Sequence, residues 1–264
     1  MGGDATGHEN GLRSGLRFPL SSLLTALRFL TILPISWRSK EDGRFFQASL
    51  IWFPVVGLLI GTMAAPVVFL STMMLPSTLV AVLAIVFLAG ISGCLHLDGL
   101  ADSGDGLLSA RPRQQALDIM RDSRSGAMGV IVLIFVLLGK YAALSALPVG
   151  SMVTAVFLMP LAGRTAILLT MAVLPYARTG EGLGRLFYSA DSRILGLATV
   201  FFYALVALFF SWKLAFLLLA AILLTVALFS CWCFRKIGGA TGDTLGAVCE
   251  LTELATAVGF TLTF

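Results

Sequence analysis

The sequence is poor in charged residues, in histidine and in cysteine. Asp, Glu, Lys and Arg make up 12% of the 264 residues and hydrophobic residues 58%, whereas an average soluble domain carries about 25% charged residues. So few charges exclude an ordinary soluble domain and predict an all-α, polytopic integral membrane protein. The two histidines and four cysteines also argue against a zinc site, because no Cys-x-x-Cys pair accompanies Cys94 and His96.

A basic surface of the kind that binds nucleic acid is missing as well. The net charge is +4, but the basic residues alternate along the chain instead of gathering on one soluble face. Every Lys and Arg except Lys140, Arg164 and Lys213 falls in the N-terminal 49 residues or in three later loops, 94–128, 175–193 and 235–245. Because Lys and Arg collect in short cytoplasmic loops, the pattern predicts a cytoplasmic N-terminus and three cytoplasmic loops, and no nucleic-acid partner.

The sequence contains several long hydrophobic runs. About 20 mostly apolar residues cross a bilayer as a helix, and six runs qualify: 50–70, 77–93, 129–147, 151–174, 194–211 and 214–234. A seventh, 246–264, has Glu250 and Glu253 near its start. We therefore predict six to seven transmembrane helices in one transmembrane domain, residues 20–264, after a flexible polar tail, residues 1–19. For residues 20–35 we predict an amphipathic or re-entrant helix, and the alternative is a short transmembrane crossing.

Three aspartates stand out in the segment HLDGLADSGDG. Asp98, Asp102 and Asp105 are spaced i, i+4 and i+7, so a helix would place all three carboxylates on one stripe. Like charges on one stripe repel one another, and a divalent cation between them would remove that repulsion. Hard oxygen ligands suit Mg²⁺, which often binds carboxylates together with substrate phosphates. The pattern predicts a Mg²⁺ site, and the alternative is a solvated acidic loop.

Basic residues suited to phosphate follow the acidic segment. RDSRSGAMG places Arg121, Asp122 and Arg124 just before a predicted crossing, and guanidinium groups bind phosphate oxygens with paired hydrogen bonds. The alternative is an ordinary cytoplasmic anchor for the helix. Arg164 lies within a predicted crossing, where an unpaired charge is costly, so we expect it to point into the bundle toward the acids. Lys140, the other embedded cation, is placed so that it can snorkel to the membrane surface.

Two further segments combine glycine with charge. LPYARTGEGLGRLF contains Arg178 and Arg185 among glycines and is only loosely similar to a phosphate-binding loop. GGATGDTLGAVCELTE contains Asp243, Glu250 and Glu253, which again share one helical stripe. These acids suit a second part of the ion site or a general base. Alternatively, the two glutamates cap the last helix.

Taken together, LHLDGLADSGDGL, MRDSRSGAMG, LPYARTGEGLG and GGATGDTLGA resemble, in order and spacing, the motifs of the cobalamin synthase family, the adenosylcobinamide-GDP ribazoletransferases. The resemblance runs from about Phe29 to the C-terminus. It implies a Mg²⁺-dependent enzyme of the cytoplasmic (inner) membrane of a prokaryote, acting late in vitamin B12 assembly. The substrates would be adenosylcobinamide-GDP and α-ribazole or its 5′-phosphate, and GMP would leave. Membrane lipid would surround the protein, and a homo-oligomer or an association with other corrinoid-assembly enzymes stays open.

The residues singled out above fit this implied chemistry. Asp98, Asp102 and Asp105 would hold Mg²⁺ against the pyrophosphate, with Asp98 and Asp102 also acting in catalysis. Asp243 or Glu250 would bind an ion or remove a proton. The remaining candidates would bind the substrate or its phosphates: His96, Arg121, Asp122, Arg124, Arg164 and Arg178.

Two other classes of function use similar residues. A CDP-alcohol-type phosphotransferase of lipid synthesis also combines clustered aspartates, Mg²⁺ and a departing nucleotide, but DGLADSGDG lacks the spacing of its motif. An ion-coupled transporter would have its acids near the membrane midplane, whereas the acids of this sequence cluster at one face.

Overall fold

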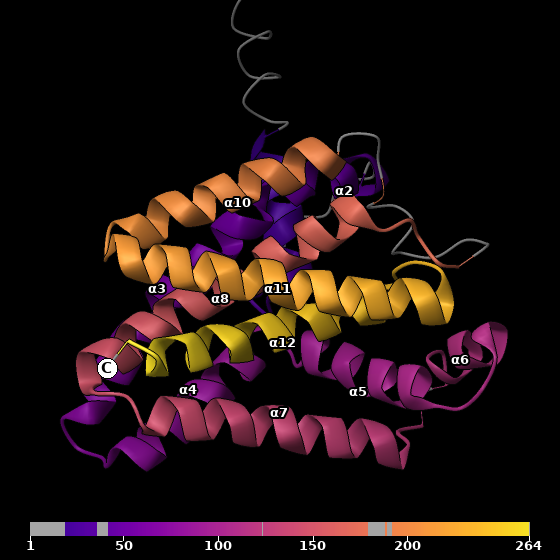
Figure 1. Cartoon of the computed structure of the whole chain (residues 1–264). Coiled ribbons are helices and arrows are strands. Elements are labelled where there is room, and N and C mark those ends of the chain that lie inside the picture. The colour runs from indigo at the N-terminus through magenta and orange to yellow at the C-terminus, as the bar shows by residue number, and fades with distance from the viewer. Residues whose placement is uncertain (1–18, 36–41, 123, 179–187, 189–191, 264) are drawn as a thin grey trace, which may run out of the picture.

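Apolar runs form helices because a backbone in lipid must satisfy its hydrogen bonds within its own segment. The computed structural model describes residues 19–35, 42–122, 124–178, 188 and 192–263, and these residues build a bundle of helices (Figure 1). In chain order the helices are Pro19–Leu30, α2 (Asp42–Ser49), the 3-10 helix η1 (Leu50–Trp52), α3 (Phe53–Thr72), α4 (Ser77–Ile91), α5 (Leu95–Leu108), α6 (Arg113–Ile119), α7 (Ala127–Ser145), α8 (Val149–Val173), α10 (Ser192–Leu208), α11 (Trp212–Ile237) and α12 (Gly242–Thr261).

The predicted all-α multi-pass class is confirmed, but the predicted six to seven crossings are not. Within the described residues, four helices are long and apolar enough to cross a membrane: Phe45–Thr72, Ala127–Ser145, Val149–Val173 and Trp212–Ile237. The helices α4 and α5 together make a fifth candidate, bent by 91°. The difference has a physical cause, since α10 has only 17 residues and α12 carries two buried glutamates.

The N-terminal segment is a short helix that packs on the bundle. Pro19–Leu30 is too short to cross a membrane as one helix. The Nε1 of Trp52 donates a hydrogen bond of 2.9 Å to the Ser22 hydroxyl, which ties this helix to η1. The predicted tail, residues 1–19, lies outside the described residues except for its last position.

The helix α12 lies at the centre of the bundle. It packs against α5, α7, α8 and α11, and Figure 1 shows it between α7 and α11. Because protein covers most of its surface, α12 does not need the apolar, lipid-facing side that α7 and α11 present. This position lets α12 hold charged and small residues against four neighbours.

A sharp turn between α4 and α5 sets the direction of α5. Gly93 and Cys94 both adopt left-handed backbone angles, with φ of 59° and 58°, a conformation that only glycine enters without strain. The resulting bend separates two helices that hydropathy alone would join. It directs α5 toward the end of the bundle that also holds α6 (Figure 1).

Candidate active site

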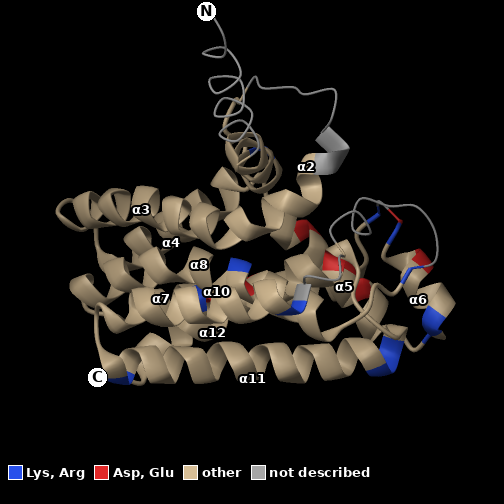
Figure 2. Cartoon of the chain, turned by 90° about the horizontal axis from the view of Figure 1, so that it is seen from above, with Lys and Arg blue, Asp and Glu red and all other residues tan. Residues whose placement is uncertain are grey.

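Charged residues gather at the end of the bundle that holds α5 and α6. Figure 2 shows acidic residues on and around α5, basic residues near α6 and the adjacent end of α11, and a smaller charged group midway along the bundle. HLDGLADSGDG lies within α5, so the stripe expected for a helical segment forms. Asp98 is exposed, and Asp102 is half-buried.

Glycines bring α5 and α12 close enough to unite two of the predicted motifs. A Cβ atom added at Gly99 would lie 2.8 Å from the backbone oxygen of Asp243, and one added at Gly246 would lie 3.2 Å from the backbone oxygen of His96. Any larger side chain would push the two helices apart. The contact places the start of α12 beside the acidic stripe of α5.

The charges of Asp98, Asp105 and Asp243 all act on Asp102, and among the described residues the cation that acts on it is Arg178. We call Asp98, Asp102 and Asp243 the acidic site. Among the described residues, no three His, Cys, Asp or Glu side chains lie close enough together to hold a metal ion on their own. Mg²⁺ commonly uses one or two carboxylates and completes its shell with water and substrate phosphates, so the donor set fits Mg²⁺ only when a substrate supplies further oxygens.

Arg178 and Asp243 reach each other through a short piece of paired backbone. Ala177 N donates to Ala240 O at 2.8 Å, and Ala240 N donates to Pro175 O at 2.9 Å. Arg178 follows directly after Ala177, and it donates to Oδ2 of Asp243, three residues after Ala240, at 2.7 Å. The LPYAR and GGATGD motifs are thus joined by a direct ion pair. Arg185 and the glycines after Arg178 lie outside the described residues.

Asp105 has a role that the sequence did not reveal. Its two carboxylate oxygens accept hydrogen bonds from Gly126 N at 2.7 Å and Gly129 N at 2.8 Å. It therefore caps the start of α7, whose first amides need an acceptor. These first amides of α7 could bind an anion such as phosphate, but they already hold this carboxylate, while Mg²⁺ binding by Asp105 stays a prediction.

Arg121 and Arg124 lie on the surface beyond α6. Arg124 donates to Asp122 Oδ2 at 2.6 Å through one of its terminal nitrogens, and these hydrogen bonds lower the pKa of Asp122 to about 2. The guanidinium of Arg124 and the side chain of Arg121 are exposed. Their predicted roles in binding substrate stay predictions.

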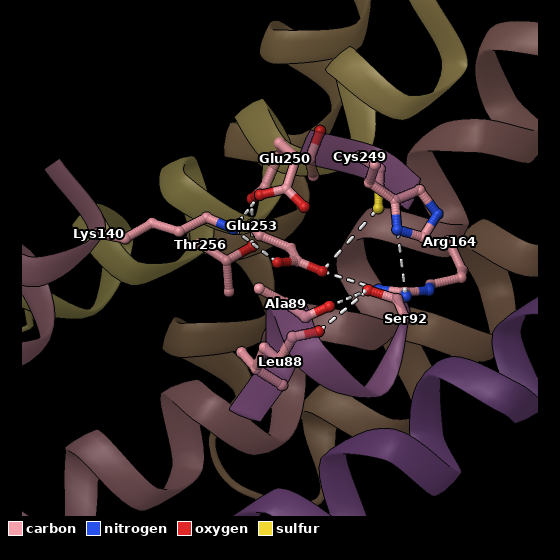
Figure 3. A network of polar contacts seen from close by, with 11 residues as sticks. Leu88, Ala89, Ser92, Lys140, Arg164, Cys249, Glu250, Glu253 and Thr256 are labelled. Atoms are coloured by element: carbon pink, nitrogen blue, oxygen red, sulfur yellow. Dashed lines mark hydrogen bonds and ion pairs between the residues drawn. The ribbon is translucent and has the colours of Figure 1, made fainter. Parts of the chain in front are cut away.

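A buried charge network lies deeper in the bundle and comprises Lys140, Arg164, Glu250 and Glu253. Figure 3 shows Glu253 between the two cations. Lys140 Nζ contacts Glu250 Oε2 at 2.6 Å and Glu253 Oε2 at 2.7 Å, and Arg164 contacts Glu253 Oε1 at 2.8 Å. The inward orientation predicted for Arg164 is confirmed, since its side chain is 2% exposed.

Two expectations change in light of this network. Lys140 does not snorkel, because its side chain is 4% exposed and both its partners are buried. Glu250 and Glu253 do not cap α12 but cross-link it to α7 and α8. Glu250 lies seven residues after Asp243 on α12, about 10 Å along the axis, so its role as a general base stays a prediction. His96 Nδ1 lies 3.5 Å from Arg164 and connects the network to α5.

The fold and the site define a class of protein, a multi-pass helical membrane protein with a carboxylate site at one end of the bundle. The family model of cobalamin-5-phosphate synthase matches residues 22–261. The chain belongs to this family. No solved structure matches it.

Curated relatives carry one common name, adenosylcobinamide-GDP ribazoletransferase. The protein of Clostridium acetobutylicum is 35% identical over 88% of this chain and 92% of its own length. That of Acetivibrio thermocellus is 37% identical over 89% of this chain and 94% of its own. The protein of Desulforamulus reducens is 38% identical over 88% of this chain and 93% of its own length. The similarity therefore extends over nearly the whole of each chain.

Proposed function

We propose that this protein joins adenosylcobinamide-GDP to α-ribazole, or to its 5′-phosphate, and releases GMP. The observation that carries the proposal is the meeting of the α5 aspartates with the Arg178–Asp243 pair at one end of the bundle. Family membership and the shared name of the relatives support the same activity.

The proposed reaction is a phosphoryl-type transfer. A ribose hydroxyl of α-ribazole attacks the phosphorus that carries the cobinamide, and a new oxygen–phosphorus bond forms. The bond between that phosphorus and the bridging oxygen of the pyrophosphate breaks, and this oxygen leaves as part of GMP. The hydroxyl proton passes to a carboxylate of the acidic site, for which Asp102 and Asp243 are the candidates. Arg178 is positioned to bind a phosphate oxygen once substrate competes for its contact with Asp243.

Mg²⁺ is the cofactor that we propose for this site. Asp98 and Asp243 both act on the charge of Asp102, while the guanidinium of Arg178 is already paired with Asp243, an arrangement that leaves negative charge uncompensated until a cation binds. Asp98 and Asp102 would hold the ion, which would neutralise the pyrophosphate and the leaving GMP. Asp98 is accessible for this role because it is exposed.

We further propose that the acidic site faces the cytoplasm from the inner membrane of a prokaryote. The uneven distribution of Lys and Arg favours this orientation, and soluble nucleotide substrates would reach the site from that side. Lipid would contact the exposed apolar side chains of the outer helices, such as Phe135, Phe201 and Phe216.

An assay of the purified protein in detergent tests the proposal. With adenosylcobinamide-GDP, α-ribazole and Mg²⁺, we expect equal amounts of corrinoid product and GMP. The Asp98→Asn variant should fold but lose about 100-fold or more in turnover, since a lost metal ligand removes several kcal/mol of charge stabilisation. Asp118→Asn on α6 is the matched control and should keep wild-type turnover. Absence of GMP release by the wild-type protein, or full activity of Asp98→Asn, would contradict the proposal.

A further inference from the structure

A cavity of about 200 Å³ opens beside the acidic site. It lies where the helix Pro19–Leu30, α3, α5, α8 and α12 meet, and its lining includes the carboxylate-bearing residues Asp98 and Asp243. Most of the remaining lining is apolar and includes Leu30, Ile167 and Met171. The cavity thus joins the reacting end of the site to an apolar recess within the bundle.

Aromatic rings form one wall of this cavity. Phe29 and Phe53 both line it, and their rings are stacked with centroids 6.1 Å apart and an interplanar angle of 21°. Phe46 meets Phe29 edge-on, with centroids 6.5 Å apart and an angle of 86°. Because the ring of Phe29 contacts aromatic rings on two sides, the wall is an apolar, aromatic surface of the kind that a flat aromatic ligand packs against.

The first turn of α12 leaves the cavity open. Gly242 lines it, and a Cβ atom added at this glycine would meet no atom within 4 Å. The backbone of Gly242 does not have the positive φ that would require glycine. A side chain introduced here would therefore occupy space without displacing protein atoms.

We propose that this cavity holds the flat bicyclic base of α-ribazole, an inference that rests on the proposed function. We call the cavity the base pocket. A corrin ring is too large for about 200 Å³. A guanine base would bury several donors and acceptors against an apolar wall, where each unpaired polar group is costly. The dimethylbenzimidazole base of α-ribazole is small, flat and mainly apolar, and a ligand pocket of this kind needs only a few polar groups to orient its occupant.

The polar edge of the base pocket gives the bound nucleoside a direction. With the base against Phe29 and Phe53, its ribose extends toward Asp98 and Asp243, which line the same cavity. The attacking hydroxyl then lies beside Asp243, one of the two carboxylates proposed to accept its proton. The base pocket therefore selects the acceptor substrate and orients it for the proposed transfer.

Filling the base pocket tests the inference. In Gly242→Leu we expect KM for α-ribazole to rise by about tenfold or more, because an occupied apolar pocket excludes its ligand. KM for adenosylcobinamide-GDP should change by less than about threefold, which is the variation expected of a neutral substitution. In Gly242→Ala the single added methyl meets no protein atom, so KM for α-ribazole should rise by a smaller factor. This variant keeps the test valid if Gly242→Leu does not fold. Gly90→Leu in α4 is the matched control, because an added Cβ there also meets nothing within 4 Å, and it should leave both KM values unchanged.

Direct binding separates this inference from the proposed function. Equilibrium dialysis of α-ribazole alone against the purified wild-type protein and the Gly242→Leu variant requires no turnover. Weaker binding to the variant supports the base pocket even if the wild-type protein shows no transfer, an outcome that would overturn the proposed function only. Equal binding to both proteins, or a rise in KM for adenosylcobinamide-GDP alone, overturns the base pocket while leaving the activity intact.

Discussion

Glu253 is shared by two cations, Lys140 and Arg164, in the interior of the bundle. Charged groups removed from water are stable only while their partners remain. Lys140 has a second carboxylate in Glu250, whereas the acidic partner of Arg164 in the network is Glu253 alone. The two glutamates of α12 are therefore unequal, although both are buried.

Replacing each glutamate by glutamine should expose this inequality. Glu253→Gln leaves Arg164 without a carboxylate and should lower the free energy of unfolding by about 3–5 kcal/mol. Glu250→Gln leaves both cations in contact with Glu253 and should cost clearly less. Unfolding of the two variants by denaturant in detergent micelles measures the difference. Equal losses would show that the cations redistribute freely between the carboxylates.

Single residues also show what sequence reasoning can and cannot establish. The high cost of an isolated guanidinium in a membrane predicted that Arg164 points inward, but no local pattern links it to Glu253, which is 89 positions later in the chain. Asp105 was assigned to a metal by its spacing, which cannot distinguish a ligand from a helix cap formed with glycines more than 20 positions away. Long-range partners depend on helix packing, and packing is not encoded in a single motif.

At the scale of elements, Arg113 joins two segments that end at the acidic site. Its Nε donates to Ile237 O at 2.7 Å, at the end of α11, and a terminal nitrogen donates to Ala177 O at 2.9 Å. Arg178 follows directly after Ala177 and contacts Asp243. Arg113 thus fixes the backbone from which Arg178 extends, without touching the acidic site, and it acts as a positioning residue.

Removing this link should affect turnover more than stability. Arg113→Gln should reduce kcat by about tenfold, since a small displacement of Arg178, the group proposed to bind phosphate, is costly, and lower the free energy of unfolding by about 1–2 kcal/mol. Lys236→Met is the control, because Lys236 also joins the end of α11 to backbone, at Ser109 O and Arg111 O, but does not contact the Pro175–Arg178 segment. It should lose similar stability and keep its kcat. Matching kcat losses in the two variants would refute the positioning role.

Hydropathy predicted where many of the helices lie in the sequence, but it did not predict how the helices pack against one another. The run 129–147 became α7, and 214–234 became part of α11, because length and apolarity are local properties. Hydropathy marked 94–128 only as the connection between two crossings, yet this segment contains α5, which begins at Leu95. Its glycines, which weaken an isolated helix, instead allow α5 to approach α12, and only the packed structure reveals that use.

At the scale of the whole molecule, the two ends of the bundle should face different compartments. Met74 lies in the turn between α3 and α4 and is 87% exposed, and Gln115 is exposed on α6 at the end with the acidic site. Phe53, at the start of α3, borders the base pocket, so the turn after α3 lies at the opposite end.

Cysteine labelling of intact cells tests this orientation. After replacement of the exposed Cys94 and Cys231, we expect an impermeant reagent to label a Met74→Cys variant in intact cells. A Gln115→Cys variant should react only after the cells are permeabilised, because the distribution of Lys and Arg predicts that this end of the bundle faces the cytoplasm. The opposite pattern would place the acidic site outside the cytoplasm and exclude the proposed supply of nucleotide substrates.

The central position of α12 has a consequence for biogenesis. A segment with two glutamates enters a bilayer poorly on its own, because each uncompensated charge at the membrane centre costs roughly 2.5–3.5 kcal/mol. Lys140 and Arg164, which neutralise these acids, are synthesised earlier, on α7 and α8. Insertion of α12 is therefore favourable only after α7 and α8 have assembled around its place, so the ion pairs make completion of the acidic site conditional on correct assembly of the preceding helices.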